Sequence, residues 1–132
     1  MIRRSLRYLT LSLALASSLS AAEKLKVLIV DGQNNHKWDI TTPVLTNALE
    51  SSGAFTVTVS TTPPKDELKE AWDAWQPKFS EFAAVVSNYN GVDWPEAVQK
   101  DFESYVQNGG GFVCVHAADN SFGGWKAYNE MI

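Results

Sequence analysis

Cysteine is almost absent from this sequence, because Cys114 is the only one among its 132 residues. No intrachain disulfide can therefore form, and a small scaffold stabilised by disulfides is excluded. Stability must come from an ordinary hydrophobic core. The residues after Ala22 number 132 minus 22, or 110, which is just enough for such a core.

Arginine is absent beyond the first few residues. Arg3, Arg4 and Arg7 are the only arginines, so the sequence from residue 23 onward carries eight lysines against 15 acidic residues, a formal charge of 8 minus 15, or −7. We do not expect nucleic acid as a partner, because an acidic surface does not attract phosphates. The side chain best suited to bidentate binding of phosphate or carboxylate is also missing.

An apolar run long enough to span a bilayer is missing as well. The apolar segment 9–16 is short and contains Thr10 and Ser12. It follows the three arginines and precedes Ser20-Ala21-Ala22, which is the arrangement of a secretory signal peptide with its cleavage site. We predict that residues 1–22 are this signal peptide, that the protein is secreted or periplasmic, and that no stable membrane insertion remains after cleavage. The alternative is that the segment is retained as an anchor.

The remaining sequence alternates strand and helix patterns. Continuous apolar or β-branched runs predict strands over 25–32, 55–60, 82–91 and 111–116. Amphipathic patterns predict helices from Thr42 with Pro43 at the first helical position, over 65–75, from Pro95 to about Gln107, and at the start of the final WKAYNEMI. In the first of these helices, one face is expected to carry Val44, Leu45, Ala48 and Leu49.

Strands that alternate with helices indicate a doubly wound parallel sheet, so we predict an α/β fold. Only about four strands are predicted, against roughly five or six in such folds. We therefore expect a C-terminally truncated chain in which residues 23–132 form the N-terminal part of one α/β domain.

Polar side chains follow three of the predicted strands, in DGQNNHKWD (31–39), NYNGVDW (88–94) and HAADNSFGGW (116–125). In an open parallel sheet, ligands bind beyond the carboxyl ends of the strands. His36 and His116 are the only histidines and both lie in these segments, so we expect that they converge and that at least one is functional. The alternative is that these are ordinary polar turns, which Asn and Asp favour.

Trp38, Trp94 and Trp125 occur in the same three segments. An aromatic face can stack on the apolar face of a sugar while nearby amides bind its hydroxyls, so all three are candidate substrate-binding residues. The alternative is that they cover helix ends as hydrophobic lids. Trp72 and Trp75 lie at helical spacing, and we expect them to be packing residues.

Cys114 invites comparison with the nucleophile of cysteine-dependent amidases. Such a nucleophile sits on a sharp, exposed turn between a strand and a helix. Cys114 instead lies between Val113 and Val115, inside a predicted strand, where a buried thiol stays protonated. We expect Cys114 to be a core residue.

Three segments together resemble the ThuA-like (trehalose utilisation) family of the class I glutamine amidotransferase-like superfamily: KVLIVDGQNNHKW, NYNGVDWP and GGGFVCVHAADNSFGGWKAYNEMI. The resemblance covers most of residues 24–132. It implies a flavodoxin-like fold without the catalytic cysteine of the amidotransferases, and a role in the uptake and breakdown of disaccharides such as trehalose, sometimes through 3-keto-sugars. Carried over by position, it implies a pocket formed by His36, Asn34, Asn35, Asn88, Tyr89, His116, Asp119 and Asn120.

Our leading hypothesis is an enzyme that acts on a disaccharide or keto-sugar. His116 would be the general acid or base, because imidazole titrates near neutral pH, and Asp119 would orient it or act as a second base. Alternatively, His36, His116 and Asp119 would bind a divalent metal such as zinc that polarises a carbonyl. The contrasting hypothesis is a non-catalytic sugar-binding module of a larger protein, for which aromatic stacking and amide hydrogen bonds suffice.

Overall fold

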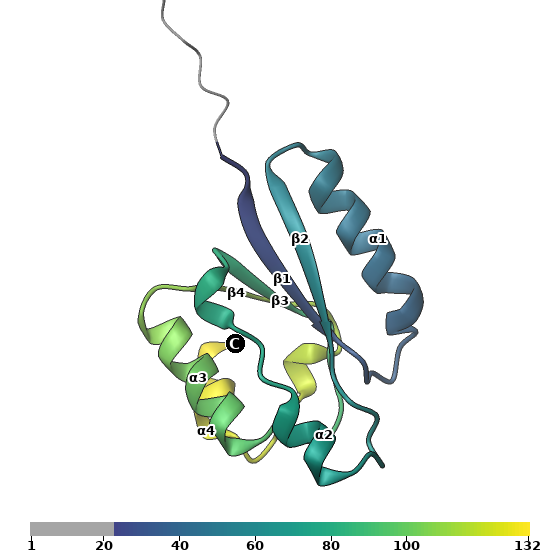
Figure 1. Ribbon diagram of the computed structural model, residues 1–132, viewed down its shortest axis with the longest axis vertical. Coiled ribbons are helices and arrows are strands. Elements are labelled where there is room, and N and C mark those ends of the chain that lie inside the picture. Colours follow the sequence, from purple (N-terminus) through teal and green to yellow (C-terminus); the bar gives the residue numbers. More distant parts are fainter. Residues whose placement is uncertain (1–22) are drawn as a thin grey trace, which may run out of the picture.

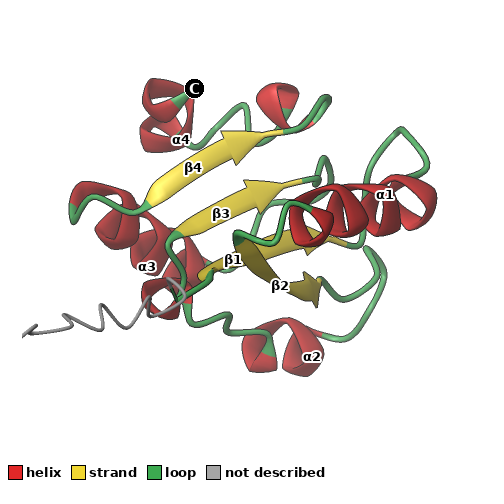
Figure 2. Cartoon of the chain, turned by 90° about the horizontal axis from the view of Figure 1, so that it is seen from above, coloured by secondary structure: helices red, strands yellow, loops and turns green. Residues whose placement is uncertain are grey.

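The computed structural model describes residues 23–132, so the predicted signal peptide lies outside the described residues. Within this range, one parallel sheet has the strand order β2-β1-β3-β4. Its members are β1 (Leu25–Asp31), β2 (Phe55–Thr61), β3 (Ala84–Ser87) and β4 (Gly111–Cys114) (Figure 2). The strands confirm the predicted α/β class, and their order is that of flavodoxin-like folds.

Helices cover both faces of this sheet. They are α1 (Trp38–Ser51), α2 (Lys69–Ala74), α3 (Glu96–Gln107) and α4 (Lys126–Met131), with short 3₁₀ turns η1 (Phe79–Glu81) and η2 (Ala118–Asn120). Figure 1 shows α1 on one side of the sheet and α3 with α4 on the other. The helix expected in WKAYNEMI is therefore present as α4.

The first helix begins earlier than the sequence predicted. It starts at Trp38 rather than near Thr42, and Pro43 lies inside it. The amides of Ile40 and Thr41 donate to the Lys37 carbonyl over 3.1 and 3.0 Å, which forms the first turn before the proline is reached. The ring of Pro43 fits helical φ, and its missing amide leaves one helical hydrogen bond unmade without ending the helix.

The expected apolar face of α1 is only half buried. Leu45 and Leu49 pack against a cluster of Val27, Ile29 and Val86 on the sheet. Val44 is 63% exposed and Ala48 is also exposed, so only Leu45 and Leu49 of this face contribute to the packing.

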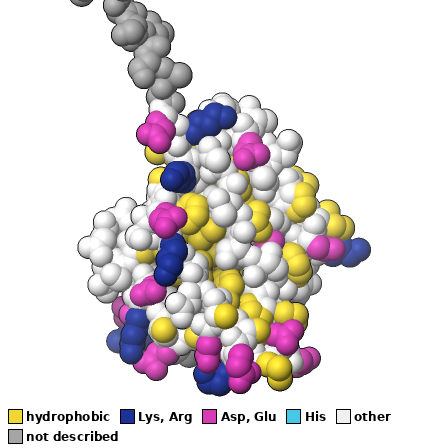
Figure 3. All heavy atoms as spheres, viewed as in Figure 1, with side chains coloured by type: hydrophobic (Ala, Val, Ile, Leu, Met, Phe, Trp, Pro, Cys, Tyr) yellow, Lys and Arg dark blue, Asp and Glu magenta, His cyan; other side chains and the backbone are white. Residues whose placement is uncertain are grey.

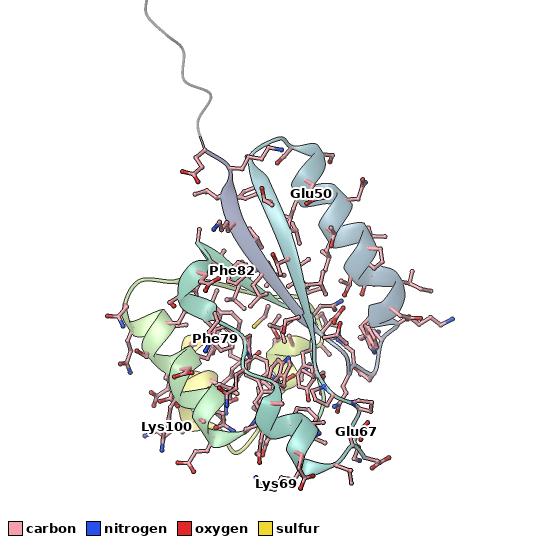
Figure 4. The ribbon with its side chains drawn as sticks, viewed as in Figure 1. Glu50, Glu67, Lys69, Phe79, Phe82 and Lys100 are labelled. Carbon is pink, nitrogen blue, oxygen red and sulfur yellow. The ribbon has the colours of Figure 1, made fainter. Side chains whose placement is uncertain are left out.

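The larger core lies between the sheet and the helices on its other face. It joins Leu28, Val30 and Val85 of the sheet to a group of mostly aromatic side chains. These are Trp72, Phe79, Tyr89, Trp94, Val98, Phe102, Tyr105, Phe122, Trp125 and Tyr128. In Figure 4, Phe79 and Phe82 lie between the sheet and α3. Successive residues of a strand point to opposite faces of the sheet. Because helices cover both faces, every residue in the middle of β1 is buried, which explains its continuous apolar run. Trp72 and Trp75 pack as expected.

The surface mixes both signs of charge. Lysine and acidic side chains are interspersed over the face that Figure 3 shows. Exposed ion pairs one helical turn apart join Lys69 to Asp73 and Lys100 to Glu96, and such pairs contribute little to stability. Among residues 23–132, no helix is both long and apolar enough to cross a membrane.

Candidate functional site

The two histidines lie together beyond the carboxyl ends of the strands. Their ring centroids are 5.1 Å apart, and the ring planes are inclined by 50°. His36 comes from the loop after β1, and His116 from the loop after β4, which leave the sheet at the same edge (Figure 2). The convergence expected from the strand ends is therefore present, although β3 separates the two strands.

Asn34 shapes the loop that carries His36. Its side-chain oxygen accepts a hydrogen bond from the backbone amide of His36 over 2.9 Å, which forms a tight Asx turn. Its side-chain nitrogen donates to the Asn88 carbonyl over 3.3 Å and ties the turn to the end of β3. Asn34 therefore positions His36, and Asn35 and His36 themselves are exposed.

The loop after β4 is fixed by its backbone. Sheet pairing continues as far as the Val115 amide, which donates to the Ser87 carbonyl over 2.9 Å. Two carbonyls further along each accept a side-chain donor: the Asn90 amide donates to the Ala117 carbonyl over 2.9 Å, and the Tyr128 hydroxyl donates to the Ala118 carbonyl over 2.8 Å. The loop is thereby held while the side chains of His116 and Asp119 stay outside the core.

His116 and Asp119 form a hydrogen-bonded pair. The distance from His116 Nδ1 to Asp119 Oδ1 is 3.2 Å, and the two side chains are 65% and 52% exposed. An ionised carboxylate only accepts hydrogen bonds, so Nδ1 carries the proton in this contact. The lone pair of the neutral ring is then on Nε2, which is the arrangement of a base oriented by a carboxylate. Asn120, the next residue, is exposed beside this pair.

Asn88 and Tyr89 do not face the ligand side of the loops, so the prediction that they contact substrate is wrong. Asn88 is 1% exposed, and its amide donates to the hydroxyls of Thr41 and Thr42 over 2.9 and 3.0 Å. Tyr89 is fully buried and donates to the Val92 carbonyl over 2.6 Å. Burial, and then the negative charge of Asp93, raise the pKa of Tyr89. Both side chains use their polar groups inside the fold.

Trp94 and Trp125 are also buried, at 2% and 6% exposure, which contradicts their predicted role as sugar-stacking residues. Both rings pack on Phe122, with centroid distances of 5.1 and 5.3 Å. The indole nitrogen of Trp125 donates to the carboxylate of Glu103 over 2.7 Å. Their loops turn back over the core, where large apolar surfaces are most stable. Trp38 is the one of the three that stays partly exposed.

An open hollow of about 490 Å³ lies where the loops after β1, β2 and β3 meet, and its lining includes Asn35, the residue before His36, but neither histidine. Its lining consists mainly of amide side chains, and comprises Gln33, Asn34, Asn35, Trp38, Lys65, Asn90, Gly91 and Val92. The hollow lies near the boundary between β1 and β3, where the strand order reverses and ligands commonly bind in such sheets. A second hollow, of about 560 Å³, lies beside α2.

The sequence identified only part of this lining. Asn34, Asn35 and Trp38 were predicted, whereas Gln33, Lys65, Asn90 and Gly91 were missed. Gln33 and Asn90 lie in the polar segments that follow predicted strands, so their position could have identified them as it identified Asn34 and Asn35. Lys65 follows β2, which is not one of the three strands followed by the polar segments. The pairing of β2 with β1 brings this lysine to the hollow.

Cys114 packs against the larger core, as expected. Its sulfur is 3.5 Å from the Tyr128 hydroxyl. Burial raises the pKa of the Cys114 thiol, the contact with Tyr128 opposes that shift, and the charge of Asp119 adds to it. The pKa of Tyr128 is raised as well, first by its burial and then by its hydrogen bond to Cys114. A protonated thiol in a strand is not an activated nucleophile.

The structure does not assemble the predicted metal site. Across residues 23–132, no three His, Cys, Asp or Glu side chains are grouped so that they could hold a metal ion. Nδ1 of His116 is already engaged by Asp119. Zinc binding by His36, His116 and Asp119 stays a prediction.

Comparison with known proteins agrees with the resemblance seen in the sequence. A family model described as ThuA, trehalose utilisation, matches residues 26–132. The chain belongs to the ThuA family. The crystal structure of a ThuA-like protein from Parabacteroides merdae superposes on this ThuA domain with a TM-score of 0.77 and 41% sequence identity. The match covers 81% of this chain and 37% of that one. No curated protein matches the chain.

Proposed function

We propose that this ThuA-family protein is an exported enzyme that acts on a disaccharide or keto-sugar of the trehalose type, with His116 as its general acid or base. The observation that carries the proposal is the 3.2 Å contact between His116 Nδ1 and Asp119 Oδ1, beside the ring of His36. The family description supports the substrate class.

His116 would act through Nε2. This atom takes a proton from a carbon next to a keto group, so the C–H electron pair forms an enolate and the ring becomes a cation that the carboxylate of Asp119 stabilises. The enolate then forms a C=C bond as the C–O bond to the departing sugar oxygen on the adjacent carbon breaks, and Nε2 returns its proton to that oxygen. Positioned proton transfer of this kind typically accelerates a reaction by roughly 10²–10⁴-fold.

His36 would supply the second proton-transfer group. A ring centroid separation of 5.1 Å allows one substrate atom to lie near both imidazoles. Asn35 and Asn120 are exposed on the same loops and would bind sugar hydroxyls, while Trp38 in the wall of the hollow would stack on the ring.

A His116→Ala variant tests the catalytic role, with a 3-keto-disaccharide as substrate and product formation followed by mass spectrometry. We expect kcat/KM to fall by roughly 10²–10⁴-fold, and a smaller loss in Asp119→Asn, where the orienting charge is removed. Asp101→Asn is the matched control, since Asp101 is an exposed carboxylate on α3, and it should retain full activity. Undiminished turnover by His116→Ala would contradict the proposal.

The alternative function is a non-catalytic sugar-binding module. It is favoured by the hollow, whose amides and indole could bind a sugar without either histidine. Saturable binding of disaccharides by the wild-type protein, with no product from any of them, would support this alternative instead.

A further inference from the structure

The hollow between the loops after β1, β2 and β3 carries charge of one sign only. Lys65 is its single charged lining residue, and no Asp or Glu takes part. Over residues 23–132 as a whole, acidic residues outnumber lysines 15 to eight. The lining therefore holds one positive charge and no carboxylate, which favours a negatively charged ligand.

Lys65 has no ion-pair partner within the described part of the chain. The lysines that form ion pairs there are Lys69, Lys100 and Lys126, each with an acidic residue one helical turn away. The ammonium of Lys65 is exposed and uncompensated, so a ligand anion would not have to displace a protein carboxylate from it.

The backbone next to Lys65 is held in place. The Gln33 side chain donates to the Pro63 carbonyl over 3.0 Å and accepts from the Val92 amide over 3.1 Å, so it joins two walls of the hollow. The indole of Trp72 donates to the Pro64 carbonyl over 3.2 Å. The attachment point of the lysine is thus fixed before a ligand arrives, which lowers the entropy lost on binding.

Two further groups of the hollow are free to bind a ligand. The amide of Asn35 and the indole nitrogen of Trp38 make no hydrogen bond to any other residue of the described range, whereas both polar atoms of Gln33 are engaged. The hollow therefore offers a ring-sized apolar face, an amide and an ammonium.

We propose that this hollow selects a sugar that carries an anionic group, with Lys65 binding the anion and Asn35 with Trp38 binding the ring. The inference rests on the proposed function, since it names the kind of sugar that would bind in the hollow adjoining the loop of His36. A carboxylate of an oxidised sugar and a phosphate ester share the required chemistry.

Calorimetric titration with three matched ligands tests this selection: trehalose, trehalose 6-phosphate, and the uronic acid form of trehalose. The wild-type protein should bind at least one anionic ligand about fivefold more tightly than trehalose, and the difference should shrink as salt is added. In Lys65→Gln, the anionic ligand should bind no better than trehalose, while the affinity for trehalose itself is unchanged. Lys78→Gln, which removes an exposed lysine outside the hollow, should keep the preference.

The outcomes separate the two proposals. A preference for the uronic acid identifies a carboxylate as the recognised group, and a preference for the phosphate identifies a phosphate ester. Equal affinity for charged and neutral sugars, or a preference that survives in Lys65→Gln, would overturn the selection by Lys65 and leave the proposed function intact. If none of the three sugars binds, the selection by Lys65 fails, while turnover of the 3-keto-disaccharide decides the proposed function separately.

Discussion

The loop after β4 separates two kinds of side chain, which differ in how far they are exposed to solvent. On its outer side, His116 and Asp119 are exposed beside His36. On its inner side lies what we call the aromatic cluster: Tyr89, Trp94, Phe122, Trp125 and Tyr128. The outer group contributes little to packing, while the cluster presents no free face to a ligand. The segment after β4 therefore supplies both the proposed catalytic pair and three members of the packing behind it, Phe122, Trp125 and Tyr128.

The largest expected effect is on the aromatic cluster. Trp94→Ala removes a side chain that is 2% exposed and should lower the free energy of unfolding by about 3–5 kcal/mol. Trp38→Ala, the matched change at a partly exposed tryptophan, should lower it by less than about 1.5 kcal/mol. Urea unfolding followed by circular dichroism measures both. Similar losses for the two variants would contradict the division between cluster and surface.

Gly91→Ala should have the next largest effect, because it disturbs the wall of the hollow. A Cβ at this position would lie 2.4 Å from Gln33 Oε1 and 2.7 Å from the Tyr89 hydroxyl. We expect a loss of about 1–3 kcal/mol in the free energy of unfolding, together with weaker sugar binding. Gly123→Ala is the control, because no atom lies within 4 Å of the added Cβ. If Gly91→Ala were as stable as the wild-type protein, the neighbouring side chains would have moved to accommodate the methyl group at no cost, and the prediction would be wrong.

Cys114 provides a smaller, pH-dependent contrast between interior and surface. Burial raises the pKa of its thiol, so the folded state favours the protonated form. The resulting contribution to stability is present below the pKa of the unfolded thiol and is lost as the pH rises through the folded value. At about pH 8, iodoacetamide should alkylate the native protein roughly tenfold more slowly than the denatured protein. Mass spectrometry measures both rates, and equal rates would indicate an accessible, reactive thiol.

The smallest stability effects should come from the exposed pair. His116→Ala and Asp119→Asn should each change the free energy of unfolding by no more than about 0.5 kcal/mol, because both side chains are more than half exposed. Urea unfolding of the two variants checks this. A loss comparable to that of Trp94→Ala would mean that the pair serves the fold, and a loss of activity could not then be assigned to chemistry.

The sequence predicted the sheet because a strand covered on both faces must be apolar along its whole length, as β1 is. It also predicted the meeting of His36 and His116, since the ends of parallel strands share one edge. The neighbouring residues in the sequence do not determine in which direction a loop turns, so the burial of Trp94 and Trp125 could not be predicted. Phe122 adopts a left-handed conformation with φ of 56°, within the segment that leads Trp125 back into the core.

Lys65 illustrates a second limit. Its importance depends on β2 pairing with β1, which is a property of strand order and not of the residues around it. The start of α1 was misplaced for a local reason: proline favours the first turn of a helix, yet it is tolerated one turn later when its φ is already helical.

The central claim is that His36 and His116 share one ligand site, and the imidazole NMR signals of the protein test it most directly. The chain has two histidines, so each ring can be assigned by a single substitution. On titration with a keto-disaccharide of the trehalose type, both sets of ring signals should shift together and saturate at the same ligand concentration. If the sugar binds saturably and neither ring responds, the two histidines do not form the site.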